Sequence, residues 1–145
     1  MFSAVNQPDG SKKDTIRNIE SNGQFVVNVV PFRLAEKMFA TSENFDFETS
    51  EFDSVGLTPV PSQSIATPGV AESPIRFECE SIQIVNVGEG PLAANVVIGK
   101  ILLIEVAESG LDENNKIDPA LLDTVGRMGG MGYCRTTERF EMKRD

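Results

Sequence analysis

Short apolar runs alternate with turn-forming residues along the first thirty positions of the chain. Residues 1–5 are mostly apolar and stop at the turn formers of residues 6–10, which predicts a strand that runs into a loop. Residues 24–30 are rich in β-branched side chains and end at Pro31. We therefore predict a second strand there, buried on most of both faces.

Two helices are predicted in the same half of the chain. Ser11 stands three residues before Asp14, the spacing of a capping box, and Ile16 with Ile19 supplies a short apolar stripe before Gly23. Residues 33–40 carry apolar side chains at helical spacing, which predicts a second amphipathic helix.

The middle of the chain predicts irregular structure. Residues 41–53 hold five acidic side chains and no basic one, with three phenylalanines interleaved, so we expect a solvated loop pinned by aromatic rings. Residues 55–74 contain four prolines, which exclude a regular helix and leave at most extended edge structure.

The last half predicts one strong hairpin. Apolar positions in residues 75–87 and 95–106 flank the turn at residues 88–91. Asp118 before Pro119 predicts the start of a short helix, and residues 133–137 predict a short strand. About four or five strands with two or three short helices give a β-dominated α+β domain over residues 1–145, which favours a barrel.

The composition of the chain restricts the binding partners and the cellular location that we expect. The chain carries 13 basic and 22 acidic residues for a net charge of −9, which argues against a nucleic-acid partner. No apolar run reaches membrane-spanning length and the first residues do not resemble a signal peptide, so we expect a cytoplasmic protein without a membrane partner.

The absence of histidine excludes the common zinc sites and the Ser-His-Asp triad. Cys79 and Cys134 form no CxxC motif, so we expect two ordinary reduced thiols and no metal site. Redox chemistry in this chain would require a cofactor.

Three segments are candidates for binding. Residues 11–15, Ser-Lys-Lys-Asp-Thr, place hydroxyls and two ammonium groups at a helix start, where an anion such as phosphate binds readily; an ordinary capped helix with solvated lysines fits as well. Residues 126–133 form a glycine-rich turn between a helix and a strand, and residues 56–62 form a rigid loop with hydroxyls. A structural turn and an edge segment, respectively, are equally simple interpretations.

Six ordered motifs together resemble the flavin reductase-like family with the FMN-binding split-barrel fold. They are Phe2-Ser3-Ala4; residues 13–19 with residues 23–28; residues 56–62; Val70-Ala71-Glu72-Ser73-Pro74 leading to Glu78-Cys79-Glu80; Val97-Ile98-Gly99-Lys100; and residues 127–133.

The resemblance implies an FMN cofactor, NAD(P)H as possible electron donor, a homodimer and no catalytic nucleophile. Its implied cofactor-binding residues are Ser3, Ala4, Ser11, Lys13, Asp14, Thr15, Arg127, Gly129 and Gly130, and its implied substrate-side loop residues are Gly56, Thr58 and Ser62. Lys13 and Thr15 would hold the FMN phosphate.

Family members usually begin with further strands, so the resemblance also implies a domain that lacks those N-terminal strands. An FMN-binding oxidoreductase, passing hydride or electrons between NAD(P)H, flavin and an acceptor, is the leading hypothesis. A non-catalytic flavin-binding or electron-carrier domain and an inactive truncated fragment stay open as alternatives.

Overall fold

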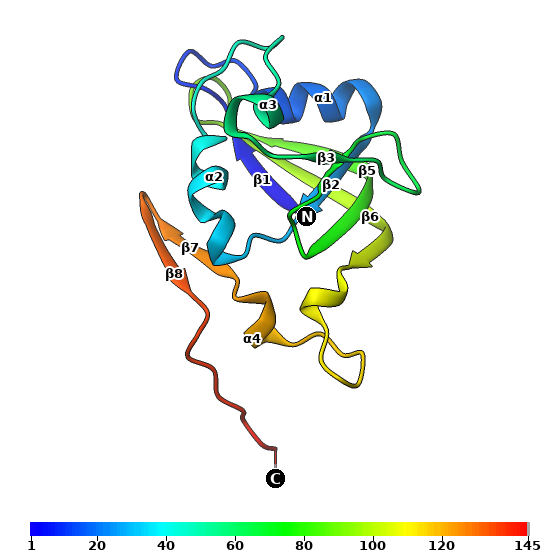
Figure 1. Ribbon diagram of the computed structural model, residues 1–145. Coiled ribbons are helices and arrows are strands. Elements are labelled where there is room, and N and C mark those ends of the chain that lie inside the picture. The colour runs from blue at the N-terminus through cyan, green and yellow to red at the C-terminus, as the bar shows by residue number, and fades with distance from the viewer. Residues whose placement is uncertain (145) are drawn as a thin grey trace.

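The computed structural model describes residues 1–144 and is built on one curled antiparallel sheet (Figure 1). Four strands form it in the order β1-β6-β5-β2, and two small two-stranded ladders, β3-β4 and β7-β8, lie outside it. The strands are β1 (Phe2–Val5), β2 (Gln24–Asn28), β3 (Pro59–Val60), β4 (Gly69–Val70), β5 (Ile75–Val87), β6 (Ala94–Val106), β7 (Val125–Gly129) and β8 (Gly132–Arg135).

Short helices lie around this sheet. They are α1 (Asp14–Asn22), α2 (Ala35–Ala40), α3 (Glu51–Val55) and α4 (Pro119–Leu122), with 3-10 turns at Phe32–Leu34 and Glu108–Gly110. None of the helices in residues 1–144 is both long and apolar enough to cross a membrane. The β-dominated α+β class is confirmed, with one more helix and more short strands than the sequence predicts.

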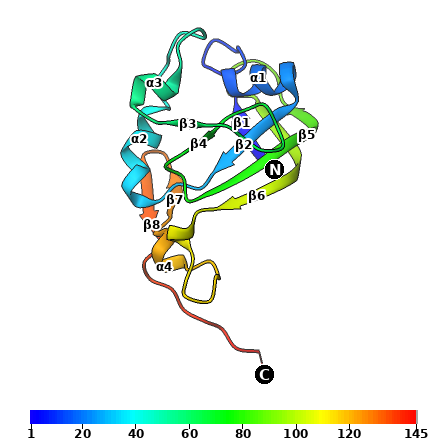
Figure 2. The same cartoon turned by 45° about the vertical axis from the view of Figure 1, so that its right-hand side comes forward.

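The hairpin of β5 and β6 is the long axis of the sheet. Its register runs from Ile75 opposite Val106 to Val87 opposite Ala94, with irregularities after Glu78 and after Ser81 that bend both strands. The bend curls the sheet into half a barrel (Figures 1 and 2). The hairpin predicted from alternating apolar positions is therefore confirmed.

The core forms where α1 lies against the concave face of the sheet. Ile16 and Ile19 of α1 pack with Phe25, Cys79 and Val97 from three strands, all of them buried. The ring of Phe2 meets that of Phe25 edge to face, with 5.3 Å between centroids. The helix ends at Gly23, whose φ of 71° is the left-handed conformation that favours glycine, as the sequence predicts.

Four local predictions are wrong. The predicted loop of residues 41–53 ends in a short helix, because α3 begins at Glu51. The capping box does not form, because the Ser11 hydroxyl donates to Asp9 and α1 begins beyond it without a side-chain cap. The strand of residues 24–30 is shorter and not buried on both faces, since Val27 is 40% exposed. The glycine-rich segment is not a turn between a helix and a strand, because β7 and β8 pair there as a hairpin.

We expect Ile16→Ala to lower the free energy of unfolding by about 2–5 kcal/mol, because it opens a cavity in the core under α1. Ile16 is 0% exposed, whereas Ile82 on β5 is 67% exposed and provides the matched control. Urea unfolding followed by circular dichroism measures both variants. Equal losses for Ile16→Ala and Ile82→Ala would contradict the importance of this contact.

Candidate functional site

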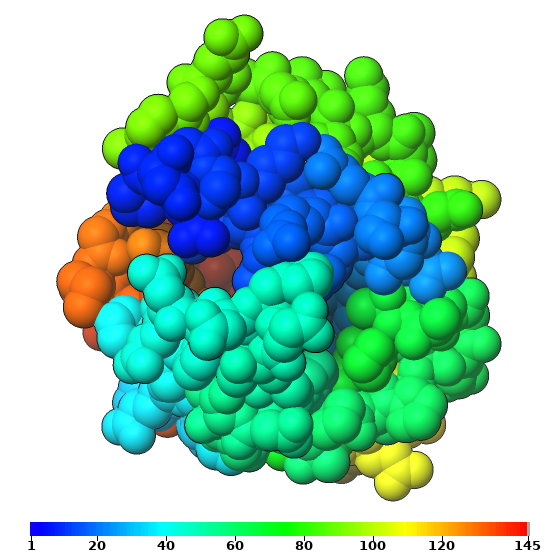
Figure 3. All heavy atoms as spheres, turned by 90° about the horizontal axis from the view of Figure 1, so that it is seen from above, coloured from blue at the N-terminus to red at the C-terminus, as the bar shows by residue number. Residues whose placement is uncertain are grey.

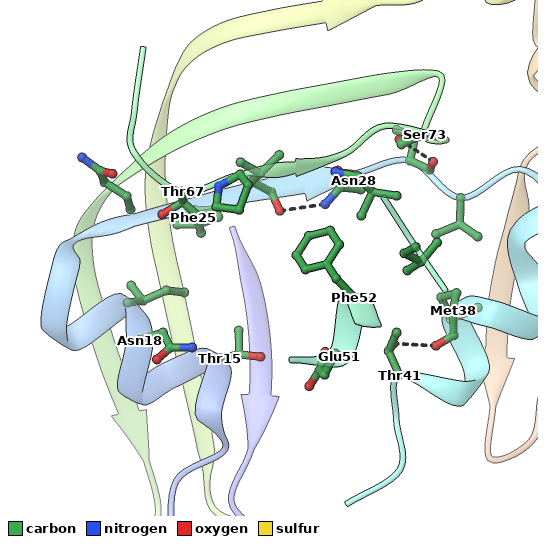
Figure 4. Close-up of a pocket in the computed structure, with 18 of the residues that line it drawn as sticks. Thr15, Asn18, Phe25, Asn28, Met38, Thr41, Glu51, Phe52, Thr67 and Ser73 are labelled. Carbon is green, nitrogen blue, oxygen red and sulfur yellow. Dashed lines mark hydrogen bonds between the residues drawn. The ribbon is translucent and has the colours of Figure 1, made fainter. Parts of the chain in front are cut away.

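A cavity of about 740 Å³ lies between α1, β2, α2 and α3. This volume is within the range of about 300–1,000 Å³ that is typical of small-molecule sites. Figure 4 shows Phe52 reaching from α3 toward Asn28 on β2, with Thr15 and Asn18 of α1 on one side and Met38 of α2 on the other. Viewed from above, the surface is hollowed where the N-terminal segment, the segment that precedes α3 and the β7-β8 hairpin meet (Figure 3).

The lining of the cavity mixes polar and apolar side chains. Those along α1 are mostly polar, and those around the end of β2, α2 and α3 are mostly apolar apart from Asn28, Thr41, Glu51 and Ser73. Hydroxyl and amide side chains come from α1, the start of β2 and the nearby loop: Thr15, Asn18, Asn22, Gln24 and Thr67. Aliphatic and aromatic side chains come from the end of β2, α2 and α3: Val29, Val30, Leu34, Met38, Phe52 and Leu57. The cavity therefore suits a ligand with a flat apolar part and a hydroxyl-rich part.

The first turn of α1 lies beside the polar side chains of the cavity lining. Lys13 is the N-cap residue, its side chain is exposed, and no side chain caps the free backbone N–H groups. Lys12 is paired with Glu20, and Arg17 is paired with Asp14 at 3.0 Å. Among residues 1–144 Lys13 takes part in no ion pair, so its ammonium group is free for an anion at the helix start.

Glu51 brings a negative charge to the same place. It is the first residue of α3 and lines the cavity with Thr15. Desolvation raises the pKa of the Glu51 carboxyl, and the charge of Asp14 raises it further, while Lys13 lowers it. The mouth of the cavity thus brings together the Lys13 ammonium group and a carboxyl with a raised pKa.

Hydrogen bonds to side chains of β5 and β2 hold the opposite wall of the cavity in place. Glu78 on β5 is 1% exposed, and its carboxylate accepts from the backbone N–H groups of Gln63 at 2.8 Å and Ser64 at 2.7 Å. Gln24 accepts from Ala66 N–H at 2.8 Å. This loop supplies Ala66, Thr67 and Pro68 to the cavity wall, and it lies over β2 in Figure 2.

The residues predicted on β1 and before α1 have other places. Ser3 is exposed, while Ala4 packs against the core cluster opposite Asn95. Ser11 binds Asp9 through both its hydroxyl and its backbone N–H. Of the residues predicted to bind the cofactor, Thr15 alone lines the cavity, with Lys13 and Asp14 beside its mouth.

The predicted substrate-side loop touches the cavity through a neighbouring residue. Leu57 lines it, whereas Gly56 ends α3 and accepts a hydrogen bond from Lys37. The backbone N–H of Thr58 donates to the Glu72 carboxylate at 3.1 Å. The Ser62 hydroxyl donates to the carbonyl of Thr67 at 2.6 Å, which shapes the wall from behind.

The glycine-rich hairpin lies apart from this cavity. Arg127, Gly129 and Gly130 are exposed on β7 and the turn after it, and Arg127 donates to the Gly130 carbonyl at 3.2 Å. A second hollow of about 500 Å³ separates the hairpin from α2, and none of the three residues lines it. Met38 lines both hollows. A cofactor contact of these three residues stays a prediction.

The two cysteines are free, as the sequence predicts. Burial raises the pKa of the Cys79 thiol, which belongs to the core. Cys134 is exposed on β8 and lines the second hollow.

Most of the residues that line the cavity were not predicted from the sequence. Asn18 and Asn22 follow Thr15 at positions i+3 and i+7, so the three side chains share one face of α1. That polar stripe beside the apolar pair Ile16 and Ile19 is a signal that could have been found. Phe52 gave no such signal, because its place depends on where α3 packs.

Comparison with known proteins shows the family to which this chain belongs. The profile described as "Flavin reductase like domain" matches residues 4–132. The chain belongs to the flavin reductase-like family. A protein of Halalkalibacterium halodurans is 38% identical over 99% of this chain and 69% of its own length, and one of Aquifex aeolicus is 35% identical over 99% and 71%.

Solved structures agree. Nitrilotriacetate monooxygenase component B from Bacillus cereus superposes with a TM-score of 0.86 at 31% identity, covering 97% of this chain and 70% of that one. The 2-nitrobenzoate 2-nitroreductase from Pseudomonas fluorescens superposes with a TM-score of 0.81 at 31% identity, covering 99% and 74%. The resemblance drawn from the motifs and the split-barrel fold class are both confirmed.

The residues present fit the cofactor that this family implies. A flavin mononucleotide combines an apolar ring, a hydroxyl-rich chain and a phosphate. The cavity offers mostly apolar side chains around α2 and α3, hydroxyl and amide side chains along α1, and the uncapped start of that helix. Membership of the family supports a flavin cofactor and flavin-related oxidoreductase chemistry.

We expect Glu78→Gln to loosen the loop of residues 62–68, because an amide cannot accept from two backbone N–H groups with both of its terminal atoms. Hydrogen bonds to charged groups contribute about 1.5–3 kcal/mol each, so the free energy of unfolding should fall by about 2 kcal/mol. Limited proteolysis should cut this loop faster. Glu80→Gln removes the charge from an exposed neighbour on the same strand and should change neither measurement. Unchanged cleavage of Glu78→Gln would contradict this role.

Proposed function

We propose that the chain is an FMN-binding oxidoreductase of the flavin reductase-like type. The observation that carries the proposal is the amphipathic cavity that ends at the uncapped start of α1, beside the free Lys13. The family match and the two structural relatives support the same cofactor class.

In this proposal the phosphate lies at the first turn of α1. The backbone N–H groups there point out of the helix, and the helix dipole adds a partial positive charge. Lys13 supplies the ammonium group and Thr15 a hydroxyl. The polar stripe of α1 and the loop with Thr67 bind the hydroxyl-rich chain, and the mostly apolar region around Met38 and Phe52 receives the ring.

The bound flavin supplies the hydride and electron chemistry, with NAD(P)H as the donor. The residues of this chain bind and orient the cofactor and keep water from its apolar part. No side chain in this proposal acts as a nucleophile or as a proton carrier.

We propose also that the chain works as a homodimer. Val27 on β2 and Ile101 and Ile104 on β6 belong to the same sheet, with β5 between their strands, and are 40%, 52% and 54% exposed. Large exposed apolar side chains that share one sheet are typical of a surface that another chain covers. Sedimentation equilibrium of the purified chain tests the state directly.

Titration of the purified chain with FMN, followed by quenching of flavin fluorescence, tests the proposed cofactor. Riboflavin, which lacks the phosphate, is the paired ligand. We expect FMN to bind the more tightly of the two, because the site at α1 recognises the phosphate. Absence of binding by a chain that unfolds cooperatively would refute the proposal, and NADH or NADPH oxidation no faster than with free FMN would refute its catalytic part.

We expect Lys13→Ala to weaken FMN binding by about one to two powers of ten, since a charge-assisted contact contributes about 1.5–3 kcal/mol. Riboflavin affinity should stay unchanged. Lys12→Ala removes the same charge from the preceding residue, whose ammonium group is paired with Glu20. This control variant should bind FMN and riboflavin with nearly the affinities of the unaltered chain. Equal weakening of FMN and riboflavin by Lys13→Ala would contradict the phosphate assignment.

A further inference from the structure

An acidic segment folds back over the start of α1. This segment, residues 41–53, holds five carboxylates and no basic side chain. Its Phe47 lies against the Arg17 guanidinium of α1, with 3.7 Å from the Arg17 Cζ atom to the ring centroid. Figure 3 shows this segment facing the N-terminal segment across the hollow. The acidic segment is therefore tied to the helix whose start forms the proposed phosphate site.

Of its five carboxylates, Glu51 is the one that lines the cavity. The charges near it are those of Asp14, which opposes its ionisation, and of Lys13, which favours it. Arg17 is taken up by Asp14 and Phe47, and Lys37 of α2 binds the carbonyl of Gly56 at the far end of α3. Among the described residues Lys13 forms no ion pair, so its charge acts both on Glu51 and on any anion that arrives at α1.

We propose that Glu51 is a specificity-determining residue that opposes a doubly charged phosphate at this site, so that a phosphorylated ligand binds together with one proton. The inference rests on the proposed function. A phosphate monoester takes its second negative charge above a pH of about 6, and two neighbouring anions that share one cation cannot both ionise freely. The proton comes from solvent and resides on the Glu51 carboxyl or on the phosphate.

The proposal fixes the direction of the pH effect. Where the Glu51 carboxyl is neutral and the phosphate carries one charge, Glu51 does not repel the ligand. As pH rises through the elevated pKa of Glu51, the carboxylate forms and repulsion grows. FMN affinity should therefore fall by about tenfold per unit of pH where one proton is taken up on binding, whereas riboflavin affinity should stay level.

The test compares Glu51→Gln with Asp53→Asn at pH 6 and pH 8. Both changes remove one negative charge from the short helix α3, and Asp53 is exposed and outside the cavity lining. Glu51→Gln should bind FMN up to about tenfold more tightly than the unaltered chain at pH 8 and show a flatter pH dependence. Riboflavin affinity of this variant, and both affinities of Asp53→Asn, should match the unaltered chain.

The outcomes separate this inference from the proposed function. An unchanged pH dependence in Glu51→Gln, or an equal gain in Asp53→Asn, would overturn the role of Glu51 while leaving flavin binding intact. If the unaltered chain binds no flavin, the proposed function fails, and inorganic phosphate becomes the probe. A larger rise in melting temperature with phosphate for Glu51→Gln than for Asp53→Asn would still support Glu51, and equal rises would overturn it.

Discussion

The packing of α1 against the concave face of the sheet is the contact on which the other features depend. Ile16 and Ile19 are buried against Phe25, and the ring of Phe25 lies over Gly99. A Cβ atom at position 99 would stand 2.5 Å from the Phe25 Cζ atom, so this strand position has room for glycine alone unless the core shifts. The same packing aims the polar face of α1 into the cavity and brings its first turn to the cavity mouth.

The opposite wall of the cavity is held by a different kind of force. Residues 62–68 bury few apolar side chains and are anchored by backbone N–H groups that donate to the side-chain oxygens of Glu78 and Gln24. Such bonds are directional, whereas apolar packing is not. One side of the site therefore depends on packing and the other on a small number of hydrogen bonds, each of which a single substitution can remove.

The sequence predicts the parts of this fold that depend on local pattern. The β5-β6 hairpin follows from alternating apolar positions, and α1 follows from a two-residue stripe and the glycine at its end. The capping box fails because the Asp9 carboxylate, two residues away, takes the hydroxyl and N–H of Ser11. Local spacing does not reveal which of two neighbouring partners a side chain will choose.

The site is harder to predict than the fold. Its lining comes from α1, β2, α2, α3 and a loop, which only the tertiary structure brings together. Thr15 could be predicted from the sequence because it belongs to a motif at a helix start. Phe52 and Glu51 lie in a segment whose composition indicates a solvated loop, and a short helix forms there instead.

Met38 stands between the two hollows of the molecule and forms part of the lining of each. A methionine side chain has three rotatable bonds and no branch, so it changes rotamer at little cost. A molecule that pushes Met38 aside in one hollow must take space from the other. A change in the rotamer of Met38 therefore couples the β7-β8 hairpin to the larger cavity, although no residue of the hairpin lines that cavity.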